Sequence, residues 1–309
     1  MIFKIDQAFY DSLSAPVRSQ LYCDMIQHGH YVDCVYGLRQ KFYDDIDTNG
    51  SSLQKDMVKN DPSLKLPTLF KQYLTVIDVS IVDCTQLYTL INKPALLLLE
   101  NEVNETSVYC DIIRKYAKSD KSFKSLFGKL NETVENEDFE FDQVGGCTQL
   151  APMYQNHNNG KYHHTANWKI CILADRDTKG PTEVLDENKK GLLAFTCGKN
   201  LSTVTETDIY VLNQSPVIWH LWYFREIENY FPAKQYKSIN LDPDSCKDKN
   251  TDWHYKDLGT IPGYDKKNLS KLTKGMTYDD YEEGLQVFHL PGGTLSEMQL
   301  FLLKLVRII

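Results

Sequence analysis

The segment NWKICILADRD, Asn167 to Asp177, decides the fold of this chain. An unbroken apolar run such as Ile170 to Ala174 is typical of a central parallel β-strand, because helices cover both faces of such a strand. Two carboxylates, Asp175 and Asp177, follow the run directly. The carboxyl ends of parallel strands meet at a solvent-accessible crevice. The segment therefore predicts an α/β fold with acidic side chains at the open edge of its sheet.

Two further segments place acids after predicted strands. KPALLLLE ends in Glu100, and WYFREIENY carries Glu226 and Glu228. Alternate residues share one face of an extended chain, so Asp175 and Asp177 can reach one ion, as can Glu226 and Glu228 if their segment is extended. On a helix Glu228 is the favoured ligand, and Glu226 is then structural or paired with neighbouring Arg225. Oxygen-only ligands from different strands select a hard cation.

Composition narrows the class of protein. With 309 residues, 42% of them hydrophobic and 12% aromatic, the chain can form a large core, which argues against disorder. A net charge of -8 argues against an overall basic nucleic-acid-binding surface, although local basic patches or a partner can supply positive charge. The eight cysteines form no C-x-x-C pair and are interpreted as reduced thiols. The chain start and the lack of long apolar runs predict a cytoplasmic protein without a membrane segment.

The patterns along the chain predict three regions. Residues 1–88 have apolar residues at helical spacing, as from Phe9 to Met25, and are expected to be a helical region. Residues 89–240 alternate strands with helices and form the central mostly parallel sheet flanked by helices. Its strands are expected in KPALLLL, FEFDQ, KICILA and TETDIYVLNQ, with PVIWHLWYFREIENYF as a strand-to-helix element. Residues 241–309 are a loop-rich extension with a terminal helix.

Other candidate motifs have weaker support. His28, His30 and the pair His163-His164 can bind a transition metal, but they lack a carboxylate or Cys partner at helical spacing and are interpreted as surface histidines. The segment ending in Gly198-Lys199-Asn200 lacks the Ser or Thr of a phosphate loop, so no ATPase site is expected. The aromatic string can stack nucleobases, although a core position is favoured. Its members are Trp219, Trp222, Tyr223 and Phe224.

At the level of motifs, residues 90 to 240 resemble the TOPRIM family, the Rossmann-like catalytic fold of topoisomerases, bacterial primases and OLD-type nucleases. LLLLEN looks like the family's strand and glutamate, and ILADRD looks like its Asp-x-Asp motif. The chain is most similar to OLD-type and stand-alone TOPRIM nucleases of phage-defence systems, because VGG follows the second strand and REIENYF the last one. The resemblance implies a TOPRIM domain over residues 89–240.

The same resemblance implies a set of site residues. Glu100, Asp175 and Asp177 would hold Mg²⁺ or Mn²⁺, and Glu226 or Glu228 would complete the acidic site. Two positions depart from the family pattern, because Asn101 replaces a glycine and Asn104 replaces an acid. Glu102 or Glu105 can take the place of that acid. The family's catalytic lysine would be Lys234 or Lys237.

These features predict a metal-dependent endonuclease that hydrolyses the phosphodiester bonds of nucleic acid, DNA or RNA, with tRNA among the candidates. By resemblance the chain is a toxic effector of an antiphage system, controlled by a separate ATPase or sensor protein, and a homo-oligomer stays open. The alternative is a non-catalytic TOPRIM-like binding or assembly module. Two other roles rank lower. A topoisomerase is expected to have a companion domain with a nucleophilic tyrosine, and a primase is expected to have a zinc-binding module; neither is identifiable in the sequence.

Overall fold

The computed structural model describes residues 1–100, 105–180, 183, 185–199, 217–248, 250–290 and 293–309. The chain forms two compact units. Unit 1 contains residues 1–95, 157–169 and 307–309, and unit 2 contains residues 96–156 and 170–306. This division differs from the three predicted regions, since residues 241–306 belong to the same unit as the central sheet and a later stretch of chain joins the N-terminal part.

Unit 1 contains a parallel sheet that the sequence analysis missed. Its order is β2-β1-β3, and β1 pairs in parallel with both neighbours. The N-terminal region is therefore α/β and not only helical. The strands are β1 (Ile2–Lys4), β2 (Tyr31–Asp33) and β3 (Val76–Asp78). The helices are α1 (Gln7–Asp11), α2 (Ala15–Gln27), α3 (Tyr36–Asn49), α4 (Ser52–Lys59), α5 (Thr68–Lys71) and α6 (Cys84–Asn92). Each strand is three residues long, too short for an alternating pattern to stand out.

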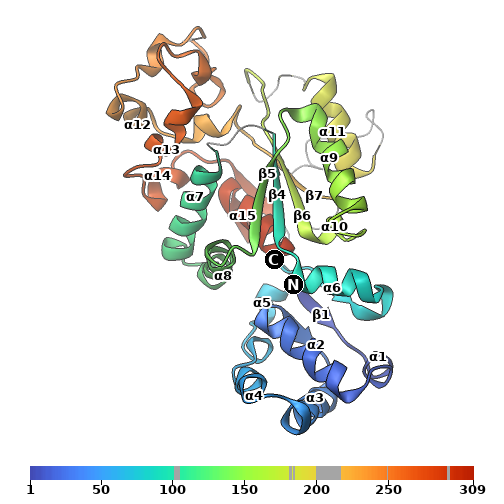
Figure 1. Ribbon diagram of the computed structural model, residues 1–309. Coiled ribbons are helices and arrows are strands. Elements are labelled where there is room, and N and C mark those ends of the chain that lie inside the picture. The colour runs from blue at the N-terminus through green and yellow to red at the C-terminus, as the bar shows by residue number, and fades with distance from the viewer. Residues whose placement is uncertain (101–104, 181–182, 184, 200–216, 249, 291–292) are drawn as a thin grey trace. The chain divides into compact units, whose positions relative to one another are not determined.

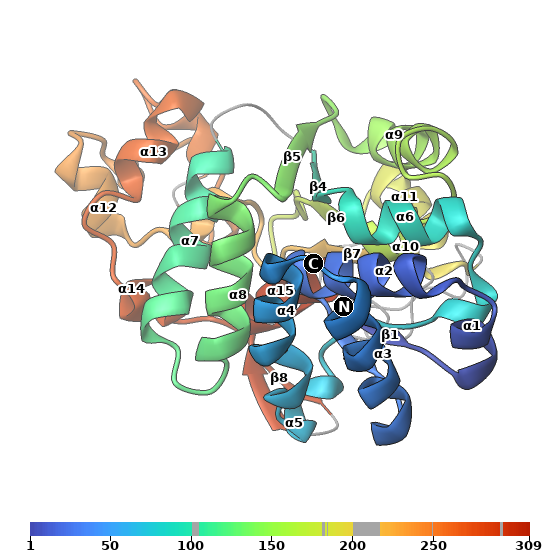
Figure 2. The ribbon, with the colours of Figure 1, turned by 60° about the horizontal axis from the view of Figure 1, so that its bottom comes forward.

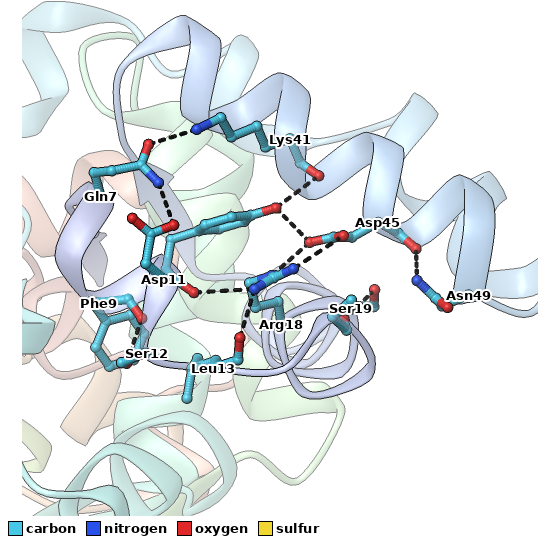
Figure 3. A network of polar contacts seen from close by, with 12 residues as sticks. Gln7, Phe9, Asp11, Ser12, Leu13, Arg18, Ser19, Lys41, Asp45 and Asn49 are labelled. Atoms are coloured by element: carbon cyan, nitrogen blue, oxygen red, sulfur yellow. Dashed lines mark hydrogen bonds and ion pairs between the residues drawn. The ribbon is translucent and has the colours of Figure 1, made fainter.

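A polar network joins α1, α2 and α3 at the edge of the unit 1 core (Figure 3). Arg18 contacts both carboxylate oxygens of Asp45, with Nε 2.6 Å from Oδ2 and Nη2 3.3 Å from Oδ1. The hydroxyl of Tyr10 donates to Asp45 Oδ2 at 2.6 Å, and the Arg18 guanidinium lies 4.1 Å from the centre of the Tyr10 ring. A two-pronged, charge-assisted contact of this kind fixes the three helices more firmly than a single exposed ion pair.

Replacing Asp45 with asparagine is expected to destabilise the protein by about 1–2 kcal/mol at pH 7, because charge-assisted hydrogen bonds are lost. Burial alone would raise the pKa of Asp45, but the hydrogen bonds from Arg18 and Tyr10 outweigh it and lower the pKa below its usual value. A depressed carboxyl pKa stabilises the fold above the unfolded pKa, and the contribution is lost as pH falls through the folded pKa. Urea unfolding should therefore show a difference from wild type that is constant from pH 7 to 5 and shrinks below about pH 4. A constant difference down to pH 3 would contradict this.

Unit 2 is built on a four-stranded sheet of order β5-β4-β6-β7. The central pair β4–β6 and the pair β6–β7 are parallel. Every residue of β4, β6 and β7 is buried, as expected for strands covered on both faces. The strands are β4 (Ala95–Leu99), β5 (Phe139–Gln143), β6 (Ile170–Ala174) and β7 (Ile218–Leu221). The predicted α/β class, with parallel strands and flanking helices, is confirmed. The predicted strand TETDIYVLNQ lies outside the described residues. The edge strand next to β6 is β7, which lies in the predicted strand-to-helix element.

Helices cover both faces of this sheet (Figure 1). On one side lie α7 (Glu105–Ser119), α8 (Lys124–Glu135) and α15 (Glu297–Ile308), and on the other side α9 (Cys147–Asn159) and α11 (Glu187–Cys197). The predicted helix after Glu100 is confirmed, because Val108, Ile112 and Ile113 of α7 are fully buried. The predicted terminal helix is confirmed as α15.

The segment between β7 and α15 is mostly short helices and loops, as its composition predicts. It contains α12 (Ala233–Ser238), α13 (Leu269–Leu272), α14 (Tyr278–Glu282) and an antiparallel pair, β8 (Val287–Leu290) with β9 (Gly293–Ser296). Of these, α13 and α14 pack on α7. Figures 1 and 2 show both helices beside α7. A further short element, the 3-10 helix η8 (Lys266–Asn268), directly precedes α13. This segment thereby brings Lys266 toward the edge of the sheet from far along the chain.

Across the described ranges, no helix combines the length and the apolar character needed to cross a bilayer. All eight cysteines are free thiols, in agreement with the prediction from their spacing.

Candidate acidic site

Glu100 follows the last residue of β4 and lies at the edge of the sheet, 8% exposed. Its Oε2 accepts a hydrogen bond from the backbone N–H of Asp175 at 3.1 Å and a second one from the ammonium of Lys189. Because β4 and β6 are parallel neighbours, their carboxyl ends lie side by side. The predicted meeting of Glu100 with the acidic segment after β6 is therefore present in the structure.

The Gly145-Gly146 turn brings β5 to the same edge. The backbone N–H of Val144 donates to the carbonyl of Leu99 at 3.1 Å, and that of Gly146 donates to the carbonyl of Glu100 at 2.8 Å. Both glycines have positive φ, 75° and 128°, a conformation that other residues adopt at a cost. The turn thus holds the backbone of Glu100 in place.

The sequence analysis placed Asp175 and Asp177 on one extended strand, and this prediction is wrong. β6 ends at Ala174, and Asp177 has a left-handed backbone with φ of 59°. The backbone N–H groups of Arg176 and Asp177 both donate to the carbonyl of Arg225, at 2.9 and 3.0 Å. Asp175 is 4% exposed, whereas the side chain of Asp177 is 43% exposed. The tight turn after β6, and not strand alternation, sets the positions of these two acids.

Glu226 and Glu228 lie at the start of the 3-10 helix η4 (Ile227–Tyr230). The helical alternative of the sequence analysis therefore applies. Glu226 caps this helix and its Oε1 is 3.2 Å from Nε of Arg225, the pairing expected in that case. Glu228 is 1% exposed, and its Oε1 accepts a hydrogen bond from the Tyr264 hydroxyl at 3.0 Å.

Glu105 is the first residue of α7 and is 3% exposed. Its Oε2 accepts a hydrogen bond from the Tyr109 hydroxyl at 2.9 Å. Of the two acids considered for the family's additional acidic position, Glu105 is the one that the structure describes, while Glu102 lies outside the described residues, as do Asn101 and Asn104. The acids gathered at this edge of the sheet are referred to below as the acidic cluster. They are Glu100, Glu105, Asp175, Asp177, Glu226 and Glu228.

The negative charges of the acidic cluster act on one another. Burial is the main cause that raises the pKa of Asp175 well above its usual value, and the charges of Glu105 and Glu226 add to it. Burial and Glu228 raise the pKa of Glu105 to about 7, and burial and Glu226 raise that of Glu228 to about 7. The pKa of Glu226 is also raised, chiefly by burial. Carboxylates from four places in the chain therefore form one electrostatic unit that favours protons or a cation.

Two buried carboxylate oxygens of the acidic cluster are suited to a ligand. Among the described residues, Glu105 Oε1 and Glu228 Oε2 have no hydrogen-bond partner. A buried oxygen of this kind is costly unless an ion, water or proton satisfies it. Hard cations such as Mg²⁺ and Mn²⁺ take oxygen ligands, so the donor set fits them. In the arrangement that the structure describes, no group of three or more His, Cys, Asp or Glu side chains has the geometry to hold a metal ion.

Two lysines that the sequence analysis did not select lie next to the acidic cluster. The ammonium of Lys189 is 2.9 Å from Asp177 Oδ2 in addition to its contact with Glu100. Lys266, on η8, interacts most strongly with Glu228 and Asp175; burial opposes its charge, but these acids outweigh the burial and raise its pKa. Lys234, the lysine chosen from the sequence, is exposed on α12 and pairs with Asp280. Lys237, the second choice, is exposed on the same helix.

The sequence holds little signal for these two lysines. Lys189 stands in the run Asn188-Lys189-Lys190, and Lys266 in Asp265-Lys266-Lys267. Each pair looks like ordinary solvated charge. One cue for Lys189 is its place in the first turn of a helix, where a cation opposes the helix dipole and is unusual without a partner.

The competing motifs take ordinary structural roles. His30 is 2% exposed and packs against Phe3, so its interpretation as a surface histidine is wrong. His163 and His164 are exposed in a turn, as expected. Gly198 is the left-handed C-cap of α11 and not part of a phosphate loop. In the aromatic string, Trp219, Trp222 and Phe224 are at most 4% exposed, so the favoured core interpretation is confirmed for these three.

Comparisons of the chain with protein-family models, with curated proteins and with solved structures find no match. The fold and the positions of its acidic residues give the class of the protein. It is an α/β protein with parallel sheets, and carboxylates from several strands and helices converge at the carboxyl edge of the sheet in unit 2.

Proposed function

We propose that this chain is a metal-dependent nuclease of the TOPRIM type that hydrolyses phosphodiester bonds with Mg²⁺ or Mn²⁺. One observation carries the proposal: Glu105, Asp175 and Glu228 are buried together at the carboxyl edge of a parallel sheet, where burial and then the charges of neighbouring acids raise the pKa of each. A cluster that only stabilises the fold is expected to pair its acids with cations or donors. Here Glu105 and Glu228 each keep one buried oxygen without a partner among the described residues.

In this proposal Glu100, Glu105, Asp175 and Glu228 hold the cation, with Asp177 at the exposed side. A bound divalent ion lowers the pKa of water and neutralises charge on the phosphate. Other residues of the chain position the proposed ligands. The Gly145-Gly146 turn fixes Glu100 through its backbone. Arg225 aligns the turn that carries Asp177, because its carbonyl accepts two backbone N–H groups of that turn.

Lys266 is expected to contribute positive charge toward a phosphate at this site. Replacing Lys266 with alanine should lower the cleavage rate about 100- to 1,000-fold, the range found when one electrostatic contact to a transition state is removed. The neighbouring Lys267 is exposed, so Lys267→Ala is the matched control and should cleave at the wild-type rate. Initial rates at saturating Mn²⁺ measure the effect. Equal rates for the two variants would remove Lys266 from the proposed machinery.

The proposed function is tested with purified protein and three substrates: plasmid, single-stranded DNA and tRNA, each with Mg²⁺ or Mn²⁺. Cleavage of one of them, lost on addition of EDTA and in the Glu100→Ala variant, is the expected result. Cleavage that persists in both Glu100→Ala and Asp175→Ala would place the chemistry elsewhere. If nothing is cleaved even with the product of a neighbouring gene present, a non-catalytic binding module becomes the better reading.

The resemblance to phage-defence nucleases motivates a further part of the proposal. We infer a toxic effector in the cytoplasm, restrained or recruited by a separate ATPase or sensor protein. The net charge of -8 supports dependence on a partner, since the average field of the chain repels a polyanion. Expression of the wild-type chain should slow bacterial growth under conditions in which Asp175→Asn does not. An ATPase gene beside this one would support the inference.

A further inference from the structure

The ammonium of Lys189 lies where two of the proposed metal ligands meet. Lys189 is in the first turn of α11, and its side chain is 2% exposed. Its Nζ donates to Glu100 Oε2 and is 2.9 Å from Asp177 Oδ2. Glu100 follows β4 and Asp177 follows β6. This single ammonium therefore bridges carboxylates from two neighbouring strands.

Lys189 is a positioned, charged group. The side chain of Asp186 caps α11 and accepts the backbone N–H of Lys189 at 2.8 Å, which fixes the residue at the start of the helix. Burial alone would lower the pKa of Lys189, but the charges of Glu100 and Asp177 outweigh it and raise the pKa above its usual value. A solvated surface lysine would have neither the burial nor the two partners.

A divalent cation held by Glu100 and Asp177 would use the same carboxylate oxygens as this ammonium. An ammonium and a cation on the same carboxylate repel each other, and the repulsion is strong at Glu100, because the side chains of Glu100 and Lys189 are largely shielded from water. The divalent cation and the ammonium therefore compete for the two carboxylates. The lysine chain has four methylene groups and can carry its charge away from the site, whereas Glu100 is held at the end of β4 and the backbone of Asp177 is held by the carbonyl of Arg225.

We propose that Lys189 is a built-in counter-ion that holds Glu100 and Asp177 in a resting arrangement, and that the divalent cation displaces its ammonium on binding. This inference rests on the proposed function, because it gives the two carboxylates to a metal ion. Lys189 is thus a positioning residue that sets metal affinity. It keeps the strand-end acids paired until the cation concentration is high enough to expel the ammonium.

The first test is a titration with Mn²⁺, followed by the loss of the free-ion signal in electron paramagnetic resonance. Lys189→Met removes the competing charge and keeps the chain length, so it should bind Mn²⁺ about tenfold or more tightly than wild type, the equivalent of about 1.4 kcal/mol. Lys189→Arg keeps the charge and should bind no more tightly than wild type. The matched control is Lys190→Met, since Lys190 is on the same helix and pairs with Glu187 at 2.6 Å. Weaker binding by Lys189→Met would mean that the lysine supports the ligands, and would overturn the proposal.

A second test needs no variant and so does not depend on how Lys189→Met folds. Wild-type protein is methylated with formaldehyde and a borane reductant, with and without saturating Mn²⁺, and the modification of Lys189 is followed by mass spectrometry. Displacement frees the amine, so its modification should be faster with Mn²⁺, while that of Lys190 should stay the same. A modification rate of Lys189 that is unchanged or lower with Mn²⁺ would overturn the proposal.

The Asp175→Asn variant separates the two proposals. If Mn²⁺ binds wild type and Asp175→Asn equally, or binds neither, the ion does not use the acidic cluster and both proposals fail. If Asp175→Asn loses Mn²⁺ but Lys189→Met binds no more tightly than wild type, the metal site stands and only the role of Lys189 fails.

Discussion

Asp175→Asn is expected to lower the rate of phosphodiester cleavage about a thousandfold, which corresponds to about 4 kcal/mol of transition-state stabilisation. Asparagine has the shape of aspartate but not its charge. Asp175 is 4% exposed and lies among Glu100, Glu105 and Glu228, so its charge is central to the acidic cluster. Removing that charge should lower the affinity of the acidic cluster for the cation more than removing the charge of half-exposed Asp177 would.

Two measurements and a control variant test this prediction. The cleavage rate is measured over a range of Mn²⁺ concentrations, since a weaker site needs more metal. Thermal unfolding without metal should show that the variant is at least as stable as wild type, because a buried charge has been removed. Asp279→Asn is the control, as Asp279 is an exposed acid of α14 in the same unit. Full activity of Asp175→Asn at every metal concentration would contradict the proposed site.

Glu228→Gln is expected to stabilise the protein without added metal by about 2–3 kcal/mol at pH 8, from the rise of the Glu228 pKa to about 7. Glutamine keeps an oxygen for the hydrogen bond from Tyr264, and it removes a buried charge next to Glu226 and Glu105. The same change takes away a proposed ligand. Mn²⁺ at a hundred times its dissociation constant should stabilise wild type by about 2.7 kcal/mol, and it should stabilise Glu228→Gln much less.

Chemical unfolding at pH 8, with and without Mn²⁺, measures both effects in one experiment. Glu283→Gln serves as control, because Glu283 is exposed and its replacement should change neither the stability nor the response to metal. Loss of stability in metal-free Glu228→Gln would show that the glutamate has a structural role. An undiminished response to Mn²⁺ would show that Glu228 does not bind the ion.

Much of unit 2 could be predicted from the sequence. The apolar runs of β4 and β6 indicate strands covered on both faces, and an acid directly after each run lies at the carboxyl edge by construction. The helix of α7 follows from the spacing of its apolar residues. The strands of unit 1 could not be predicted in the same way, since three residues give no period, and their partners are separated by whole helices.

The sequence by itself determined that this is an α/β protein and that acids stand at the ends of its core strands, because burial and the direction of a parallel strand are written in local patterns. The tertiary structure decided how those acids are charged and paired. Lys189 is 89 residues from Glu100 in the chain, and Lys266 comes from an irregular segment beyond α12. Contacts of this kind depend on where loops and helix ends return in space. The turn after β6 likewise gives Asp177 its direction through the carbonyl of Arg225. No local pattern records such long-range contacts, because one exposed-looking lysine or turn resembles another until the fold brings it beside a buried carboxylate.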